Sequence, residues 1–414
     1  MVATNSANSA QTATATVSVV PATAYSVLYS FPYAFESASL IQATDGHFYG
    51  TNEMFAYKID SSGNLTQLGS LSSSPDAPIS SLIQATDGNF YGVDSEGTGS
   101  IFKMDTSGNV TTMYSFPNTN SWTTSGAYPW AGLIQGTDGN FYGTTYLGGN
   151  VSCTPNSYGV PAYGPFDYNP GAGYGCGTVF KMDSSGNVTV LYSFSGQSDG
   201  NFPQAPLIQG SDGYFYGTTS AGGANGYGTI FKMDASGNLQ VLHSLTSTDG
   251  GGPVAALLQA ADGNLYGTTT GIPNSNTSGG EVFKVNTTGS NFTVLHSFSG
   301  ADGWSPVAPL IQGSYGSFYG TTWAGGDLTC GSWYFNVGSN YPYVRAGGCG
   351  AVFKMDLSGN VTVLHTFEEP QSGDGNDPYA GLLLGKDGNL YGTTYYGGAS
   401  IYFGTVFRLS VPST

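Results

Sequence analysis

Short runs of alternating hydrophobic and polar residues fill almost the whole chain, and they return in the same order seven times. The fullest copy reads LIQGTDGNFYGTT, then a glycine-rich stretch, then GTVFKMDSSGNVTVLYSF. Each copy is anchored by the tyrosine of an FYG or LYG motif, at Tyr49, Tyr91, Tyr142, Tyr216, Tyr266, Tyr319 and Tyr391. A repeat of this kind decides the architecture before any single residue does.

Each copy predicts four strands. In the third copy these are residues 133–137, 141–145, 178–183 and 188–194. The runs are separated by Asp-Gly and Ser-Gly-Asn turns, whose residues tolerate the positive φ angles of tight hairpins. No helical period of comparable length occurs, so we expect almost no helix.

Four antiparallel strands repeated seven times predict an all-β fold, a seven-bladed β-propeller. The ends of the chain complement each other: residues 26–31 (SVLYSF) supply an extra fourth strand, and the last copy stops after a third strand at 404–410 (GTVFRLS). The N-terminal strand is therefore expected to complete the last blade and remove an open sheet edge. An open solenoid of the same hairpins is the alternative.

We expect one propeller domain over residues 23–414, preceded by a Ser/Thr/Ala-rich segment over residues 1–22. Residues 2–21 resemble the last two strands of an immunoglobulin-like domain, with NSANSAQ as their turn. A linker is one alternative. The other is a free strand over residues 12–20 that adds to the sheet of a neighbouring subunit.

Few residues are charged: 8% of the chain, with a net charge of −17, while glycine reaches 64 residues. A phosphate backbone and an anionic membrane surface are both repelled by such a field, so nucleic acid and membranes are not expected partners. No apolar run is long enough to span a bilayer. The first residues also lack the basic and apolar regions of a secretory leader.

Two copies carry long insertions between the second and third strands, over residues 147–175 and 325–348. All four cysteines bracket these insertions, which predicts the disulfides Cys153–Cys176 and Cys330–Cys349. A bridge that closes a loop of this size contributes about 3 kcal/mol in the chain-entropy model. Disulfides imply an oxidising compartment, whereas a metal site would need CxxC or clustered histidines.

Recurrent polar positions are interpreted as structural. Three of the four histidines (the fourth is His47) share one repeat position that holds tyrosine in other copies, which indicates packing with a polar tip. Seven of the nine lysine and arginine residues share a second repeat position, and most of them have an aspartate two residues further on. This pattern favours structural ion pairs, or lysine and arginine side chains whose aliphatic parts pack on aromatic rings. The histidines are His243, His296 and His365, the tyrosines are Tyr29, Tyr114 and Tyr192, and the cations are Lys58, Lys103, Lys181, Lys232, Lys284, Lys354 and Arg408.

The sequence contains no HExxH or P-loop, and its one GxSxG match, residues 196–200, lies between two predicted strands and not between a strand and a helix. Paired carboxylates for glycoside hydrolysis stay open as an alternative, since Glu53, Glu96, Glu281, Glu368 and Glu369 are present. No cofactor is expected, and calcium in the glycine-rich loops between copies is the alternative. The aspartates of those loops are Asp199, Asp249, Asp302, Asp374 and Asp377.

In such a meander the glycine-rich connections and the loops between copies fall on one face, which also carries both insertions. Function concentrates in variable loops on a rigid scaffold, so we predict ligand binding there. The candidate residues are Trp122, Trp130, Tyr158, Tyr163, Tyr168, Trp304, Trp323, Trp333, Tyr334, Tyr341 and Tyr343. Such side chains suit sugar rings and protein contacts equally. The alternative is that the insertions only cap the ring.

The motifs DGNFYGTT, GG, GTVFKMD, SGN and VLYSF, over residues 24–410, resemble the GloVer (Gloeo_Verruco) tandem repeats of secreted, surface-anchored bacterial proteins. The resemblance implies export and a propeller-like fold, and it brings no catalytic residue. The first copy departs from it, because Asn52-Glu53-Met54 replaces the glycine-rich stretch.

We therefore predict an extracellular or cell-surface, non-catalytic binding or adhesion module for a glycan or a protein. One alternative is a structural subunit of a surface fibre or layer that self-associates through the N-terminal strand or the propeller rim. The other is a polysaccharide-active enzyme.

Overall fold

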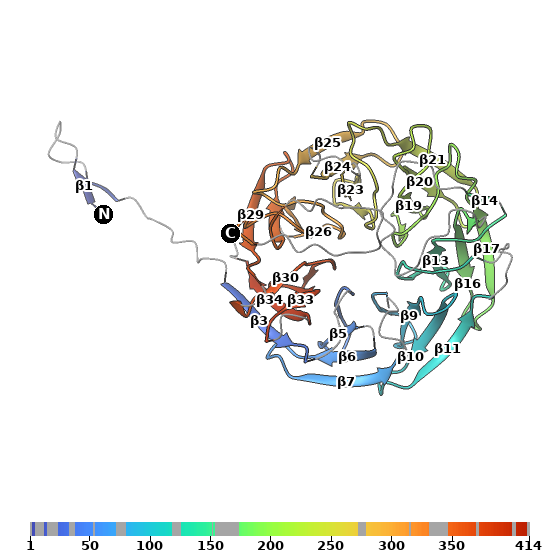
Figure 1. Cartoon of the computed structure of the whole chain (residues 1–414), viewed down its shortest axis with the longest axis horizontal. Coiled ribbons are helices and arrows are strands. Elements are labelled where there is room, and N and C mark those ends of the chain that lie inside the picture. Colours follow the sequence, from blue (N-terminus) through green and yellow to red (C-terminus); the bar gives the residue numbers. More distant parts are fainter. Residues whose placement is uncertain are drawn as a thin grey trace.

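Seven four-stranded antiparallel sheets form a ring in the computed structural model (Figure 1). The structure describes residues 2–4, 12–14, 24–32, 38–52, 54–71, 80–117, 126–150, 152–153, 174–271, 279–313, 316–330, 347–369, 372–399 and 403–411. These residues contain no α-helix. The predicted all-β, seven-bladed propeller is therefore confirmed.

The strands of blades 1 to 3 follow the repeat copies in chain order. Blade 1 contains β4 (Ile41–Gln42), β5 (Phe48–Thr51), β6 (Phe55–Ile59) and β7 (Leu65–Ser70). Blade 2 contains β8 (Ile83–Gln84), β9 (Phe90–Asp94), β10 (Ser100–Met104) and β11 (Val110–Ser115). Blade 3 contains β12 (Ile134–Gln135), β13 (Phe141–Thr145), β16 (Thr178–Met182) and β17 (Val188–Ser193).

Blades 4 to 6 repeat this arrangement. Blade 4 contains β18 (Ile208–Gln209), β19 (Phe215–Thr219), β20 (Thr229–Met233) and β21 (Leu239–Ser244). Blade 5 contains β22 (Leu258–Gln259), β23 (Leu265–Thr269), β24 (Glu281–Val285) and β25 (Thr293–Ser297). Blade 6 contains β26 (Ile311–Gln312), β27 (Phe318–Thr322), β28 (Ala351–Met355) and β29 (Val361–Thr366).

Blade 7 combines the two ends of the chain. Its strands are β31 (Leu383–Leu384), β32 (Leu390–Thr394), β34 (Thr405–Ser410) and β3 (Ala24–Ser30), in that order. The N-terminal strand β3 pairs antiparallel with β34, from Ala24 opposite Ser410 to Ser30 opposite Thr405. Figure 1 shows β3 at the outer edge of this blade, beside blade 1.

The innermost strands are shorter than predicted, two residues in place of five. In blade 3 the strand ends at Gln135 because the next backbone groups have other partners. The N–H of Gly136 bonds the carbonyl of Asn140 within the turn, and the N–H of Thr137 bonds the side chain of Gln209 in blade 4. The residues predicted to extend this strand therefore bond within the turn and to the neighbouring blade.

A β-bulge interrupts the pairing of the third and outermost strands in all seven blades. In blade 3 the register shifts between Val179 and Phe180. Bulges increase strand twist, and here they also bring adjacent blades together. Gly237, in the Ser-Gly-Asn turn of blade 4, lies against the carbonyl of Leu191 in blade 3, where a Cβ would come within 2.4 Å. This turn therefore needs glycine for its positive φ and for the close approach.

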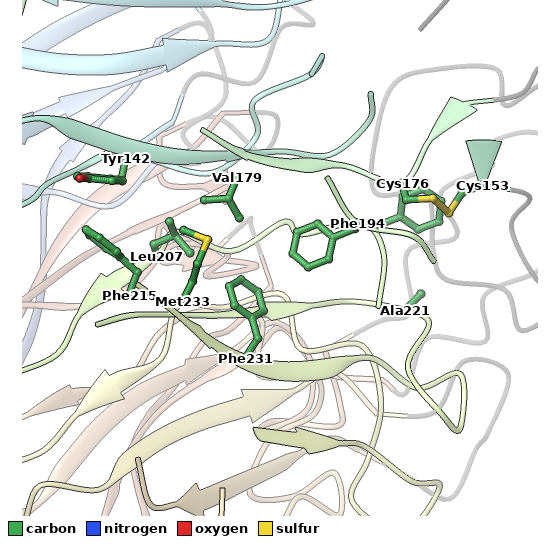
Figure 2. Close-up of a cluster of buried hydrophobic side chains, with 11 residues drawn as sticks. Tyr142, Cys153, Cys176, Val179, Phe194, Leu207, Phe215, Ala221, Phe231 and Met233 are labelled. Atoms are coloured by element: carbon green, nitrogen blue, oxygen red, sulfur yellow. A yellow bond between two sulfur atoms is a disulfide. The ribbon is translucent and has the colours of Figure 1, made fainter. Parts of the chain in front are cut away.

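The core lies between the blades. The tyrosine of one FYG motif packs on the first aromatic ring of the next motif, as in Tyr142–Phe215 with ring centroids 4.1 Å apart. The pair Tyr391–Phe48, also at 4.1 Å, joins blade 7 to blade 1. Figure 2 shows the cluster between blades 3 and 4, in which Phe231 and Met233 of blade 4 lie among residues of blade 3.

Three two-stranded sheets accompany the ring in the described residues. β14 (Ser152–Cys153) pairs with β15 (Tyr174–Gly175), and β30 (Gly375–Asn376) pairs with β33 (Tyr396–Gly397). In the N-terminal segment β1 (Val2–Thr4) pairs with β2 (Thr12–Thr14), so residues 12–14 are not a free strand. That observation corrects part of the free-strand alternative, while the immunoglobulin-like interpretation and the domain boundary stay predictions.

Candidate functional site

The two faces of the ring carry different connections, which we name the turn face and the loop face. The turn face holds the Asp-Gly and Ser-Gly-Asn turns. The loop face holds the connections between second and third strands together with the inter-blade loops. Contacts confirm that these last two kinds of segment lie together: Asn201, in an inter-blade loop, approaches Cys153 of the blade 3 insertion at 3.7 Å.

The turn face repeats a bond between the turn aspartate and the FYG tyrosine in blades 1 to 5 and 7, and a lysine joins this pair in blades 2 and 3. In blade 2 the carboxylate of Asp87 accepts hydrogen bonds from Tyr91 Oη and from Lys103 Nζ, both at 3.0 Å. Burial acts to raise the pKa of Asp87, but the bonds from Asn89, Lys103 and Tyr91 outweigh it and lower the pKa to about 2. The same cluster recurs in blade 3 around Asp138.

The predicted partner of the lysines was wrong. Lys103 pairs with Asp87 of the hairpin turn on the neighbouring strand, not with Asp105 two residues on. Asp105 instead accepts bonds from the backbone and side chain of Asn109 within its own turn. Closeness in sequence did not predict the ion pair, because the side chain of Asp105 bonds groups of its own turn. Cross-strand pairing instead places Asp87 beside Lys103.

Glutamines link the blades on the turn face. Gln135 donates a hydrogen bond to Gly139 of its own turn, and its oxygen accepts the N–H of Thr86 in blade 2, at 2.9 Å. The same inter-blade bond is made by Gln42, Gln84, Gln209, Gln259 and Gln312. In blade 7 the position is Leu384, so the link from blade 6 to blade 7 is missing.

On the loop face, the histidine or tyrosine near the end of an outermost strand binds the aspartate of the following inter-blade loop. His243 Nε2 lies 3.0 Å from Asp249, and Tyr192 donates to Asp199 at 2.9 Å. His296–Asp302 and His365–Asp374 repeat the contact at 2.8 and 3.0 Å. Burial and the Asp199 carboxylate raise the pKa of Tyr192 to about 12, so its hydroxyl stays protonated. The histidines thus have the expected packing role with a specific partner.

These bonds occupy the carboxylates considered for calcium. Asp302 also accepts bonds from the backbone and hydroxyl of Ser299, and although burial acts to raise its pKa, the bonds from Ser299 and His296 lower it. For Asp377 the backbone contacts are known: its N–H donates to the carbonyl of Cys349. Within the described part of the chain, no group of three or more His, Cys, Asp or Glu side chains could hold a metal ion.

Both predicted disulfides are present, Cys153–Cys176 and Cys330–Cys349. Each is tied to the next blade by a buried asparagine, since Nδ2 of Asn201 and of Asn376 lies 3.7 Å from a disulfide sulfur. Figure 2 shows Cys153 and Cys176 at the edge of the core cluster that holds Phe194. The bridges therefore fix the bases of the insertions to the ring.

An aromatic cluster lies where blades 3 and 4 meet on the loop face. The rings of Trp130 and Tyr146 are stacked, with centroids 4.2 Å apart and planes 15° from parallel. Phe202 of the next blade lies 4.9 Å from Tyr146. Beside them Gln204 donates to Ser220 Oγ at 2.8 Å. Trp130 and Tyr146 are half-buried, which leaves part of this neutral surface open.

The remaining predicted residues divide into two groups. Trp304 and Trp323 are described, are half-buried and lie on the loop face, where Trp304 bridges Ala324 of the next connection. The others lie outside the described residues: Trp122, Tyr158, Tyr163, Tyr168, Trp333, Tyr334, Tyr341 and Tyr343.

Sequence reasoning missed five aromatic residues of this face: Tyr128, Tyr146, Phe202, Tyr379 and Tyr395. A signal existed in the repeat. Tyr146 and Tyr395 follow the GTT motif, and Tyr379 follows the proline of the inter-blade loop. Burial raises the pKa of Tyr379 to about 12. These positions lie beside the inter-blade proline or directly after the second strand, outside the long insertions.

The fold defines the class of protein, a seven-bladed β-propeller. A streptogramin B lyase structure is similar with a TM-score of 0.59 at 16% identity, covering 94% of this chain and 97% of the other. Virginiamycin B lyase from Staphylococcus aureus is similar with a TM-score of 0.60 at 14% identity, covering 94% of this chain and 99% of the other. An oligogalacturonate lyase in complex with manganese is similar with a TM-score of 0.52 at 11% identity, covering 95% of this chain and 97% of the other. At these identities the likeness shows the fold alone.

One part of the chain matches a known sequence family. Residues 156–335 match the family model described as the Gloeobacter/Verrucomicrobia repeat, so the predicted resemblance is confirmed. No curated protein matches the chain. In the described residues no helix is long and apolar enough to cross a membrane.

Proposed function

We propose that the protein is an extracellular binding module that holds a neutral glycan on the loop face without converting it. The observation that carries this proposal is the stacked cluster of Trp130, Tyr146 and Phe202 with the amide of Gln204 beside it. Aromatic faces pack on the apolar face of a sugar ring, and neighbouring amides and hydroxyls bond its hydroxyl groups.

Two further features support the proposal. Charged residues are 8% of the chain, so the surface offers a neutral glycan many uncharged hydrogen-bonding groups. Two disulfides are typical of proteins that work in an oxidising compartment, where such glycans are exposed. The propeller neighbours that are lyases supply the fold and no catalytic residue.

The test is affinity electrophoresis of the purified chain through gels that contain cellulose derivatives, xylan, mannan or starch. We expect retardation in at least one gel, and a loss of at least about tenfold in affinity for Trp130→Ala because a stacked ring is removed. Tyr214→Ala is the matched control, since Tyr214 is an exposed aromatic residue of the turn face and its loss should leave binding unchanged. Free migration in every gel would refute glycan binding.

A second measurement separates binding from catalysis. The chain is incubated with the retained polysaccharide, and new reducing ends or unsaturated products are followed over time. We expect none. Turnover that disappears when Glu96 or Glu281 is changed to Gln would overturn the non-catalytic role and favour the polysaccharide-active alternative.

A further inference from the structure

Five inter-blade loops place residues on the loop face with one shared backbone geometry. In blades 3 to 7 a residue with φ between 56° and 62° precedes a proline. Its N–H bonds a carbonyl of the preceding blade, as Phe202 bonds Cys176, and its carbonyl accepts an N–H of its own blade, as Phe202 does from Ser220. We define an axial triplet of three positions in each of these blades. The first is this positive-φ residue, the second is the residue directly after the proline, and the third is the residue directly after the second strand.

The triplets have constant backbones and variable side chains. They are Tyr128, Trp130 and Tyr146 in blade 3; Phe202, Gln204 and Ser220 in blade 4; Gly252, Val254 and Thr270 in blade 5; Ser305, Val307 and Trp323 in blade 6; and Asp377, Tyr379 and Tyr395 in blade 7. Framework positions behave differently, since the FYG tyrosine is the same in all seven copies. The fold therefore does not dictate the triplet side chains.

Backbone strain points the same way. Tyr128, Phe202, Ser305 and Asp377 adopt a left-handed conformation that glycine adopts freely, and blade 5 shows that Gly252 fits the position. A non-glycine residue is strained in this conformation, and such residues gather at functional sites. Four of five blades nevertheless carry a side chain at this position.

Neighbouring triplets touch each other. Tyr146 of blade 3 packs on Phe202 of blade 4, and Ser305 Oγ of blade 6 bonds the carbonyl of Thr270 of blade 5, at 3.3 Å. The triplets thus follow one another around the inner ends of the blades. A ligand that binds one of them lies next to the others.

Aromatic residues gather on two sides of this circle. One group is the half-buried Tyr128, Trp130 and Tyr146 of blade 3, with the buried Phe202 of blade 4 packed on Tyr146. The other is Trp323, Tyr379 and Tyr395, on blades 6 and 7. Between them, blade 5 contributes only Gly252, Val254 and Thr270. Blades 6 and 7 each lie three steps from blade 3 in the ring of seven, so these blades lie on opposite sides of the ring axis (Figure 1).

We propose that the two aromatic groups are separate subsites for one neutral polysaccharide chain, which crosses the ring axis and stacks a sugar unit on each. The inference rests on the proposed glycan binding and specifies its geometry. It assigns the ligand class as a chain long enough to reach both groups, since a single sugar occupies only one.

The experiment is calorimetry with cello-, xylo-, manno- and malto-oligosaccharides of two to eight units. Short oligosaccharides are expected to bind weakly with two molecules per protein. Long ones are expected to bind with one molecule per protein and at least about 10²-fold more tightly, because the second contact becomes intramolecular. One molecule per protein at every length, with no gain in affinity, would overturn the two-subsite arrangement.

Variants assign the subsites. Trp130→Ala and Trp323→Ala should each remove one of the two short-chain sites and the extra affinity of long chains. Trp130→Phe and Trp323→Phe should keep both, because the stacking ring is retained, and they show that any loss with alanine is not unfolding. Tyr214→Ala is again the control. Loss of all binding through one tryptophan alone would refute the second subsite, whereas absence of binding by the unchanged chain would refute the proposed function itself.

Discussion

The turn face and the loop face of this ring are built by opposite rules. On the turn face, the bond between the turn aspartate and the FYG tyrosine repeats in blades 1 to 5 and 7 and holds each hairpin. On the loop face, the backbone repeats in blades 3 to 7 while the triplet side chains differ from one of these blades to the next. A constant residue is therefore one that the fold needs, and a variable residue on a constant backbone is free to serve a ligand.

The largest effect should come from the framework. Phe231→Ala is expected to lower the free energy of unfolding by about 3–5 kcal/mol, because its fully buried ring fills the core between blades 3 and 4. Trp323→Ala on the loop face should cost clearly less, since Trp323 is half-buried. Urea unfolding followed by fluorescence compares the two variants. An equal loss of unfolding free energy in both variants would contradict the distinction between framework positions and loop-face positions.

Next in size are the bridges that hold the insertions. Replacing Cys153 and Cys176 by serine should cost about 3 kcal/mol, as expected for a loop of 23 residues in the chain-entropy model. The measurement is the shift of the unfolding transition, and the unchanged chain in reductant serves as a control. If the variant still binds glycan, the binding site lies on the ring. If binding is lost, the binding site lies on the insertion.

Acid should weaken the contribution of the Asp87 cluster on the turn face. The folded pKa of Asp87 is about 2, below its unfolded value, so its contribution is complete above pH about 4 and is lost as pH falls through the folded pKa. Its side chain is 42% exposed, so solvent screening limits Asp87→Asn to about 0.5–1 kcal/mol at neutral pH. Unfolding curves at pH 7 and pH 2.5 check the prediction, which requires the difference between the two proteins to shrink at low pH.

The smallest effect has the opposite sign. Ser305→Gly should raise the free energy of unfolding by up to about 1 kcal/mol, because glycine relieves the left-handed strain at φ 57°. Gly252→Ala should lower it, because alanine introduces the same strain at φ 62°. Thermal unfolding measures both. Destabilisation by Ser305→Gly would mean that this side chain is required by the fold.

The sequence predicted the ring because its signals are local and repeated. The Asp-Gly and Ser-Gly-Asn turns, the FYG anchors and the bracketing cysteines each act within one copy. Side-chain contacts between separate segments were not accessible in this way. The pairing of His243 with Asp249, the stacking of Trp130 on Tyr146 and the glutamine links depend on how the chain folds back in space.

The ordering of the strands also has a consequence for biosynthesis. β3 leaves the ribosome among the first strands, but its partner β34 is made among the last, so the two must meet across nearly the whole length of the chain. Until then the growing sheet array has an unpaired edge at each end, which exposes it to intermolecular pairing. A product truncated before residue 405 would keep those edges permanently and become a preferred target for aggregation or proteolysis.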